Sequence, residues 1–318
     1  MKSINVRKSM IALLLPLVCI GMVSCHGNKT TEASCSNDSD SVLTVTAIDM
    51  TDAPFEVRQY KYGKSTKYAE VGIDITVPAG TDGVSAAVRS VLFAEVDKNF
   101  GKDMGGERCI ARYNGDMADV KKWITYYGSS SISHLSALCR DDIASNSAGE
   151  EDVKEENSIT VNADIHSYAL DLTITKDKYE TSSFVVFNVV NYSDYGGAHP
   201  NSLAYGLVFN KKTGRQIKDL FVSGADSKMQ SIIRKGLVRY FKTNGENVNA
   251  NTLNEFLMLE GRTIPLPVCS PVPSDKGLVF TYQQYEIAAY VYGMPSFVVP
   301  YNEVMPYLTS EAKSQLGL

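Results

Sequence analysis

The densest group of side chains that could do chemistry lies at residues 191–202, where Tyr, Ser, Asn, Asp and His occur together. A catalytic interpretation makes His199 a general base, Asp194 its orienter, and Ser193 or Ser202 the nucleophile. Spacing supports this poorly, because catalytic triads are recognised by geometry and not by order along the chain. The sequence also has no G-x-S-x-G nucleophile elbow. We therefore favour the alternative that Asp194 and His199 fix the shape of a loop.

A third interpretation of the same segment is a loop that binds a ligand. Two consecutive glycines permit positive φ angles and a close approach of the backbone, and a proline fixes the exit of the loop. The binding residues that this interpretation predicts are Tyr195, Gly196, Gly197, His199 and Asn201.

A second group, at residues 282–295, is rich in tyrosine. Tyrosine combines a large apolar ring with a polar tip, which suits either a binding surface or a strand-and-loop core. We favour the core for most of these rings. If the segment binds a ligand, Tyr285, Glu286 and Tyr290 are the predicted contacts. Glu286 is also the third residue, after Asp194 and His199, that an enzyme could use.

Neither a metal nor a cofactor is predicted. His134 and His166 have no neighbours at metal-ligand spacing, and the folded part has no C-x-x-C motif. The preferred disulfide is Cys109–Cys139, because it would close a loop within one domain. An export route would permit such a bond.

Secondary-structure patterns place these groups in an α+β fold. Residues 71–77 alternate as a half-buried strand, and residues 84–96 repeat at helical spacing. A second helix capped by Asp116 and a third at residues 133–143 follow.

The second half of the chain is rich in strands. Strands are predicted at residues 168–174, 184–190, 203–209, 278–285 and 297–299. Asp226 is predicted to cap a long amphipathic helix. Thr252 is predicted to open a short helix through a capping box, and a last helix begins near Asn302. Strands, then helices, then strands indicate α+β, with mainly antiparallel sheet packed against helices.

The N-terminus resembles a bacterial lipoprotein signal peptide. Three basic residues precede an almost wholly apolar run at residues 10–23, which ends in Met-Val-Ser-Cys at residues 22–25. The run is shorter than the ~20 residues that span a bilayer and has the length of a signal-peptide core. The resemblance to a lipobox implies that Cys25 is lipidated and anchors the chain to a membrane. The alternative is a soluble secreted protein in which Cys25 is incidental.

These features divide the chain of 318 residues into four predicted parts. They are a signal peptide at residues 1–24, a flexible polar tether at 25–41, and α+β domains at 42–158 and 159–318. The boundary between the domains is placed in an acidic, Ser- and Asn-rich stretch at residues 145–158. Within it, the acidic run at residues 150–156 reads as a solvated loop or as a patch for a cationic partner. The net charge of −5 gives no indication of nucleic-acid binding.

Several motifs in the second half occur in the order seen in a known family. They are Tyr-Gly-Gly-Ala-His-Pro-Asn at residues 195–201, Lys-Thr-Gly at 212–214, Asp-Leu-Phe at 219–221, and a tyrosine-rich ending at 280–301. Residues 164–308 thus resemble the extracytoplasmic domain of unknown function that ends RsiV-type lysozyme-sensing anti-sigma factors. That domain also accompanies the catalytic domain of PdaC-type peptidoglycan deacetylases, and residues 42–143 resemble the domain that usually precedes it.

Two departures limit what the resemblance implies. RsiV-type proteins have a cytoplasmic sigma-binding segment and a transmembrane helix, and this sequence shows neither. PdaC-type enzymes use a separate metal-dependent domain, whose Asp and His motifs are missing here. The resemblance therefore implies neither an anti-sigma factor nor a deacetylase.

We therefore expect a cell-envelope lipoprotein that acts as a binding or sensing module. The resemblance implies a lysozyme-like protein or a peptidoglycan-related glycan as its partner. The alternatives are an envelope hydrolase or deacetylase that uses Asp194, His199 and Glu286, and a structural lipoprotein without a small ligand. His26 stands after Cys25, where an Asp would indicate inner-membrane retention, so the outer membrane is favoured. The oligomeric state stays open.

Overall fold

The computed structural model describes residues 55–103, 105–148 and 166–318. The predicted signal peptide at residues 1–24, the lipidation site Cys25, the tether at 25–41 and the acidic stretch at 150–156 lie outside the described residues. Within the described ranges, no helix is both long enough and apolar enough to cross a membrane.

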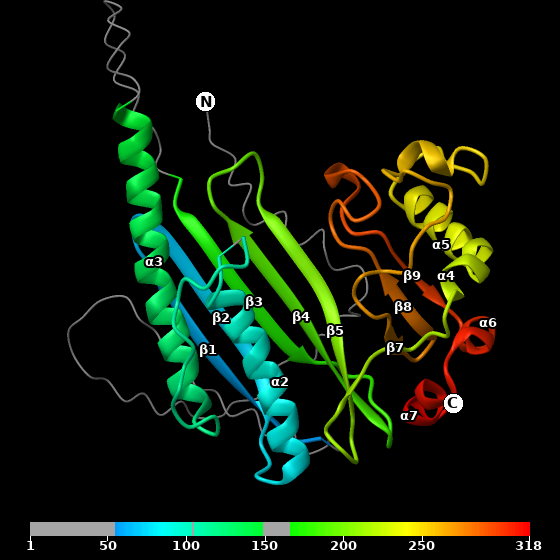
Figure 1. The fold of residues 1–318 in the computed structure, drawn as a ribbon, viewed down its shortest axis with the longest axis horizontal. Helices are drawn as coiled ribbons and strands as arrows, with labels where there is room; N and C mark the ends of the chain where they lie inside the picture. Colours follow the sequence, from blue (N-terminus) through cyan, green and yellow to red (C-terminus); the bar gives the residue numbers. More distant parts are fainter. Residues whose placement is uncertain (1–54, 104, 149–165) are drawn as a thin grey trace, which may run out of the picture. The chain divides into compact units, whose positions relative to one another are not determined.

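The described chain contains one six-stranded and one three-stranded sheet (Figure 1). The strands of the larger sheet, in spatial and chain order, are β1 (Val57–Ser65), β2 (Ala69–Pro78), β3 (Tyr168–Lys176), β4 (Phe184–Asp194), β5 (Asn201–Asn210) and β6 (Gln216–Ile217). All neighbours are antiparallel except β2 and β3, which run parallel. A parallel pair requires a long crossover, and the chain between β2 and β3 contains both helices of this region.

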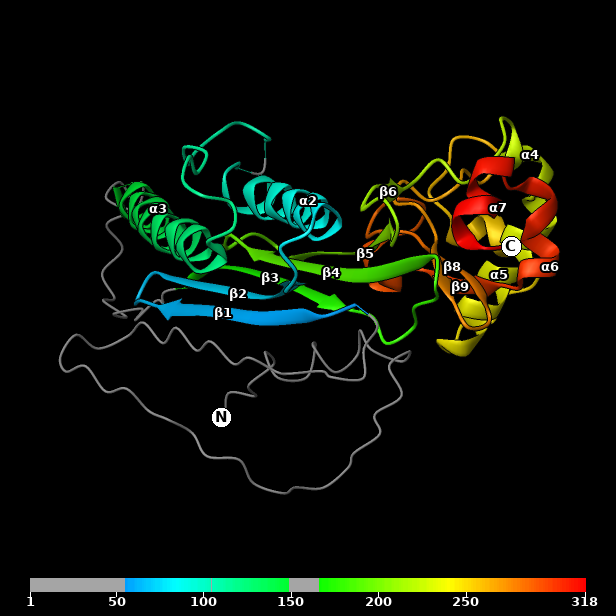
Figure 2. The same cartoon turned by 90° about the horizontal axis from the view of Figure 1, so that it is seen from below.

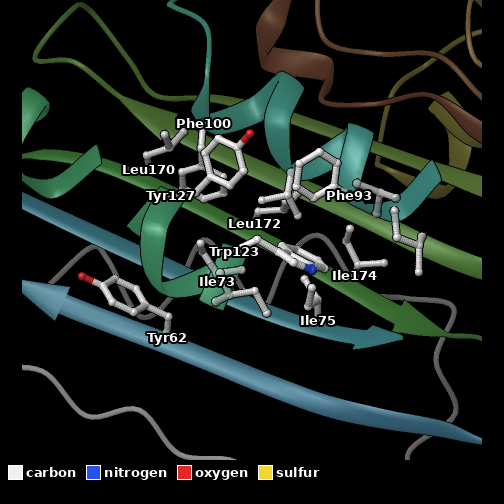
Figure 3. Close-up of a cluster of buried hydrophobic side chains, with 14 of the residues drawn as sticks. Tyr62, Ile73, Ile75, Phe93, Phe100, Trp123, Tyr127, Leu170, Leu172 and Ile174 are labelled. Carbon is white, nitrogen blue, oxygen red and sulfur yellow. The ribbon is translucent and has the colours of Figure 1, made fainter. Parts of the chain in front are cut away.

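Those two helices, α2 (Gly83–Phe100) and α3 (Val120–Ala148), cover one face of the larger sheet (Figure 2). The alternating pattern of β2 places Val71, Ile73 and Ile75 in the buried layer. All three belong to the same buried cluster as Trp123 of α3, and Figure 3 shows Ile73 and Ile75 beside Trp123. Asp82 caps α2 by accepting a hydrogen bond from the Ser85 backbone N–H at 2.9 Å. The predicted strand at residues 71–77 and helix at 84–96 are confirmed.

The two helices predicted after Asp116 are one continuous helix, α3. Asp116 does not cap it, because its carboxylate accepts a hydrogen bond from the Ala118 N–H in the preceding turn, at 2.8 Å. The three serines at residues 129–131, which lie between the two predicted helices, are helical. There the Ser133 hydroxyl donates to the Ser129 carbonyl within the helix at 3.0 Å, so the serines do not interrupt it.

The larger sheet also bears on the predicted domain boundary. Parallel pairing joins Ala69–Ile75 of β2 to Tyr168–Ile174 of β3, so a boundary at residues 158/159 would divide a single sheet. The buried residues instead form two cores. One lies under α2 and α3 and runs from Val57 to Phe209 in the chain, and the other includes β8, β9 and α5.

The second core is built around the smaller sheet. Its strands are β7 (Val272–Ser274), β8 (Gly277–Thr281) and β9 (Ser296–Val299), all antiparallel. The helical elements of the C-terminal part are α4 (Ala225–Lys228), α5 (Gln230–Thr243), η1 (Leu253–Phe256), η2 (Tyr290–Tyr292), α6 (Tyr301–Val304), η3 (Met305–Tyr307) and α7 (Ser310–Leu316). The α+β fold class, with mainly antiparallel sheets packed against helices, is confirmed.

In this part, the helix start predicted at Asp226 is wrong, whereas the short helix predicted at Thr252 is found as η1, with Thr252 as its N-cap residue but without the predicted capping box. Asp226 lies inside the first turn of α4, whose N-cap is Gly224 at φ +70°, and the helical run is interrupted at the buried Met229 before α5 begins. Thr252 does not form a capping box, because its hydroxyl instead accepts a hydrogen bond from the Asn249 N–H at 3.0 Å.

The predicted disulfide Cys109–Cys139 is not formed. Cys109, Cys139 and Cys269 are free thiols in this structure. Cys139 is buried on α3, where its thiol donates to the His166 carbonyl at 3.6 Å. Cys109 lies in the loop after α2, and its N–H donates to the Gly101 carbonyl at 3.1 Å. The two thiols thus pack in different surroundings.

The His199 surface as the candidate functional site

The base of the loop between β4 and β5 is built on Asp194. This buried carboxylate lies 2.8 Å from the Nε2 atom of His166 and accepts the Gly196 N–H at 3.1 Å. Gly196 has φ +74°, the left-handed conformation that glycine adopts most readily. Asp194 therefore shapes the loop, as the favoured sequence interpretation proposed, but its histidine partner is His166 and not His199.

The tip of the loop carries an exposed aromatic group. The His199 ring stacks on the Tyr290 ring, with centroids 3.8 Å apart and an angle of 18° between the planes. The Tyr285 ring is 5.8 Å from each of the other two rings. The Tyr285 hydroxyl lies 2.9 Å from His199 Nε2, and the Tyr290 hydroxyl donates to the Pro200 carbonyl at 2.9 Å. We call His199, Tyr285 and Tyr290 the His199 surface.

Two glutamines hold the tyrosine segment on the neighbouring strand β5. The Gln283 amide bonds twice to Ala204: its oxygen accepts the Ala204 N–H and its nitrogen donates to the Ala204 carbonyl, both at 2.9 Å. The Gln284 amide oxygen accepts the Ser202 N–H, also at 2.9 Å. A primary amide has the same donor and acceptor groups as a peptide, so these side chains take the place of a further strand beside β5.

Glu286 fixes the turn that presents Tyr285. One carboxylate oxygen accepts the Val268 N–H and the other accepts the Gln283 N–H, both at 2.7 Å. Tyr285 lies between these anchors with φ +63°, a left-handed conformation that is unusual for a bulky residue. Backbone strain of this kind persists only where surrounding contacts impose it, and the Glu286 and Gln283 bonds are such contacts.

Apolar side chains are exposed around this segment. Val291 is 81% exposed, Val268 84%, Met258 59% and Tyr285 itself 52%. The Val268 N–H bonds to Glu286 and the Met258 N–H donates to the Ile287 carbonyl, so both residues border the tyrosine segment. Several exposed apolar side chains thus lie in this segment or in residues bonded to it, as is common at interaction sites.

The catalytic interpretation requires Asp194, His199 and a serine to meet, and they do not. Asp194 bonds to His166, while the His199 ring nitrogens lie against the Pro200 carbonyl and the Tyr285 hydroxyl. Ser193 and Ser202 are buried in the paired strands β4 and β5. Both oxygens of Glu286 accept backbone N–H groups. The geometry provides exposed ring faces and hydrogen-bonding tips, which suit binding.

The structure brings only some of the predicted binding residues together. Tyr285 and Tyr290 meet His199, whereas Tyr195 packs edge-on against Tyr168 at 5.6 Å, and burial raises the pKa of its hydroxyl. Asn201 is the first residue of β5 and pairs with Ser193. Gly196 and Gly197 lie in the bend between Tyr195 and His199. Gln283 and Gln284 were not predicted as part of the site, and their only sequence signal is the Gln-Gln pair inside a tyrosine-rich segment. His166 was considered only as a metal ligand, and its role as the partner of Asp194 was not predicted.

A second polar feature lies on the larger sheet, where a hollow of about 420 Å³ is lined by Gly63, Lys64, Ser65, Glu70, Val71, Gly72 and Asp171. Gly63 and Gly72 are cross-strand partners, and Asp171 is the partner of Gly72 on the other side. Burial, reinforced by the charge of Glu70, raises the pKa of Asp171 to about 6. Within the described ranges, no three His, Cys, Asp or Glu side chains gather as metal ligands would.

Comparisons with known proteins identify similarity but no activity. Residues 218–302 match a family described as "Protein of unknown function (DUF3298)". The fold is similar to the crystal structure of a DUF3298 family member from Bacteroides fragilis, with 16% identity, a TM-score of 0.56, and 82% of this chain and 96% of that chain covered. It is also similar to a DUF3298 family protein from Pseudomonas aeruginosa, with 11% identity, a TM-score of 0.50, and coverages of 82% and 97%. No curated protein matches the chain.

Proposed function

We propose that this chain, with its DUF3298 match at residues 218–302, is a cell-envelope lipoprotein that acts as a binding or sensing module. The partner would dock on the His199 surface. The observation that carries the proposal is the exposed stack of His199 on Tyr290, with Tyr285 beside it. His199 and Tyr285 are exposed, Tyr285 by 52%, and Tyr290 is half-buried.

The chemistry of the surface favours a protein partner. Tyrosine is enriched at the energetic centres of protein interfaces, because it buries a large ring and still satisfies a polar tip. The exposed Val268 and Val291 extend the apolar area around the rings. Buried anchors hold the segment in place, so little ordering entropy opposes binding.

The resemblance to RsiV-type domains suggests a lysozyme-like protein as the partner. The chain has a net charge of −5, which would attract a cationic partner of this class. Opposite net charges speed the encounter of two proteins and make it sensitive to salt. A peptidoglycan-related glycan, whose ring faces could also pack on tyrosine, is the alternative ligand.

A binding measurement tests this function. The purified chain is immobilised and lysozyme is passed over it at low salt. We expect a saturable response that weakens at least tenfold in His199→Ala and in Tyr285→Ala. His134→Ala is the matched control, because His134 lies on α3, away from these rings, and should bind as the wild type does.

Three results would overturn the proposal. One is the absence of saturable binding. Another is equal binding by the His199→Ala and His134→Ala variants. The third is turnover of peptidoglycan fragments that His199→Ala abolishes, which would make the protein an enzyme. Competition by the same fragments, without turnover, would instead identify the glycan as the ligand of this surface.

The proposed lipid anchor has its own test. Cells that express the full chain are labelled with a palmitate analogue, and Cys25→Ser is compared with the wild type. We expect the label, and retention in the outer-membrane fraction, to depend on Cys25. Equal labelling of the Cys25→Ser variant would contradict the anchor without bearing on the His199 surface.

A further inference from the structure

The face of the six-stranded sheet that lies opposite α2 and α3 (Figure 2) has a gap in its layer of side chains. Gly63 of β1 and Gly72 of β2 are cross-strand partners, so two adjacent positions of this face carry no side chain. A Cβ atom on Gly63 would meet no other atom within 4 Å. The two glycines line the hollow of about 420 Å³. This volume lies in the range of about 300–1,000 Å³ that is typical of small-molecule sites.

Strand pairing determines which side chains border the hollow. Paired residues project from the same face of a sheet, so Asp171, the β3 partner of the second glycine, lies on the face of the glycines. Ser65 and Glu70 are also partners of each other, two residues along β1 and β2 from the glycines. Lys64 and Val71 alternate to the other face, where Val71 is buried in the core. The side chains that border the hollow are therefore two carboxylates and a hydroxyl.

The carboxylate of Asp171 lies over the floor of the hollow without a cation beside it. A Cβ atom on Gly72 would lie 2.1 Å from the Oδ1 atom of Asp171. Burial and the negative charge of Glu70 raise the pKa of Asp171 to about 6, opposed by a hydrogen bond from the Gly72 backbone. In the described part of the chain, no Lys, Arg or His forms an ion pair with either carboxylate. A cation in the hollow would stabilise both carboxylates in their charged form.

Charged groups in the neighbouring rows of this face are paired with one another. On one side of the glycines, the Lys61 Nζ atom lies 2.8 Å from the Asp74 Oδ2 atom. On the other side, the His166 Nε2 atom lies 2.8 Å from the Asp194 Oδ1 atom. Tyr192, the β4 partner of the carboxylate over the floor, donates its hydroxyl to Asp194 at 3.4 Å. These pairs leave the negative charge of the hollow uncompensated.

The chemistry of the hollow favours an ammonium group over a metal ion. Calcium takes about six to eight oxygen ligands, and within the described ranges no three His, Cys, Asp or Glu side chains gather as metal ligands would. A primary ammonium group has three N–H donors. The carboxylates of Asp171 and Glu70 and the hydroxyl of Ser65 can accept them. The glycine floor leaves room beside these acceptors for the compact body of a ligand.

We propose that the hollow binds a small molecule that carries a primary ammonium group. The ammonium group lies between Asp171 and Glu70 and donates hydrogen bonds to both carboxylates. The body of the ligand lies flat over Gly63 and Gly72. The hollow shares no lining residue with the His199 surface, so this proposal is independent of the proposed function.

The probe for this site is cyclohexylamine, and cyclohexanol is the matched control, because it has the same ring with a hydroxyl in place of the ammonium group. Two-dimensional ¹H–¹⁵N NMR of the purified chain at about pH 7.5 and low salt follows the backbone amides of Gly63 and Gly72. We expect saturable shifts of these amides with the amine and at least tenfold weaker binding of the alcohol. Raising the salt should weaken binding of the amine, because partly exposed ion pairs are screened.

Three variants test the parts of the site. Asp171→Asn and Glu70→Gln each remove one charge at nearly constant size. Gly63→Val fills the floor at a position with free space, and valine is favoured in strands. We expect Asp171→Asn and Gly63→Val to weaken binding of the amine at least tenfold, and Glu70→Gln at least threefold. Asp275→Asn and Gly261→Val make matched changes outside the hollow lining and should change the affinity less than twofold.

The pH dependence of binding provides a further test. Asp171 takes up a proton with a pKa of about 6, whereas an alkyl ammonium group stays charged over this range, as lysine does. Lowering the pH from about 7 to about 5 should therefore weaken binding of the amine to the wild type. The residual binding of Asp171→Asn should lack the part of this dependence that comes from Asp171.

Several outcomes would overturn the proposal. One is the absence of saturable shifts at the two glycine amides, and another is equal binding of the amine and the alcohol. A third is unchanged binding by both Asp171→Asn and Gly63→Val, which would show only general attraction of a cation to an acidic chain. Circular dichroism confirms that each variant is folded. Asp171→Asn, which removes an uncompensated charge, remains decisive if Gly63→Val does not fold.

Discussion

The six-stranded sheet and the tyrosine segment at residues 282–292 satisfy their backbone groups in different ways. In the sheet, strands pair with strands over long registers, such as Val57–Ser65 with Glu70–Pro78. In the tyrosine segment, side chains do much of this work: Gln283 bonds to both polar backbone groups of Ala204, and Glu286 accepts two backbone N–H groups.

The two regions therefore have different roles. The sheet stabilises the fold, and the tyrosine segment presents its rings at the surface. The sheet buries its side chains under α2 and α3, so its residues serve the core. The tyrosine segment is held by a few polar anchors, so its rings are free to face outward in a fixed arrangement. Core substitutions should therefore lower global stability, whereas changes at the rings should affect binding and leave the fold intact.

The largest effect is expected at the centre of the first core. Trp123 is fully buried and packs edge-on against Phe93 at 5.4 Å. Trp123→Ala should lower the free energy of unfolding by about 3–5 kcal/mol, because it leaves a cavity as well as removing buried surface. Urea unfolding measures this. Tyr285→Ala is the contrast and should cost less than about 0.5 kcal/mol; equal losses would contradict the separation of roles.

A polar anchor should have an intermediate effect. Gln283→Ala leaves the N–H and C=O of Ala204 without their partners, which should cost about 2–3 kcal/mol. Hydrogen exchange should show faster exchange at the Ala204 amide while Trp123 stays protected. Gln315→Ala removes a single exposed bond to Glu311 and should leave both quantities unchanged. Slow exchange at the Ala204 amide in the Gln283→Ala variant would show that the Gln283 side chain is not needed to hold the tyrosine segment on β5.

The hollow on the larger sheet predicts a pH dependence. The pKa of Asp171 is raised from 3.8 to about 6 in the fold, so the folded chain holds this proton more tightly than the unfolded chain. The protonated Asp171 side chain therefore contributes to the free energy of unfolding below about pH 4, and this contribution is lost as the pH rises to about 6. Allowing for partial exposure, the loss is about 1–2 kcal/mol.

Urea unfolding between pH 4 and 7 measures the contribution of Asp171. Asp171→Asn should lack this decrease with rising pH. Asp275→Asn, in an exposed turn, should keep the dependence of the wild type. The same pH profile in Asp171→Asn and in the wild type would contradict the raised pKa.

The smallest effect is expected at the His199 surface. Tyr290→Phe keeps the stacked ring and removes only the hydroxyl that donates to Pro200, which should cost about 0.5–1 kcal/mol. Thermal unfolding should show a small shift, and lysozyme binding should weaken less than in Tyr285→Ala. A loss of stability as large as that of Trp123→Ala would place Tyr290 in the core.

Regular elements were the most predictable part of the fold. The alternation at residues 71–77 and the helical spacing at 84–96 follow from short-range geometry and are found as β2 and α2. Helix boundaries were less predictable, since Asp116, Asp226 and Thr252 each had a plausible capping role. Whether such a side chain caps a helix depends on which N–H group lies within reach, and the residue type alone does not specify this.

The candidate site was predicted in part. The loop at residues 191–202 and the tyrosine segment were both recognised as polar clusters, and both interpretations of the tyrosines apply: Tyr282 is buried in the second core while Tyr285 is exposed. The pairing of Asp194 with His166 was not foreseen, because His166 lies 28 residues earlier in the chain. The two hydrogen bonds of Gln283 to Ala204 were not predicted, because the presence of a glutamine does not indicate which backbone groups its amide will bond to.

By itself, the sequence determined the α+β class, most strands and helices, and the two segments where polar and aromatic groups gather. These properties follow from side-chain periodicity and composition, which act over a few residues. The tertiary structure alone decided that β2 and β3 join in one sheet, that Cys109 and Cys139 stay apart, and that His199 meets Tyr285 and Tyr290. Such contacts join residues far apart in the chain and are selected by the packing of the whole core, so no local pattern encodes them.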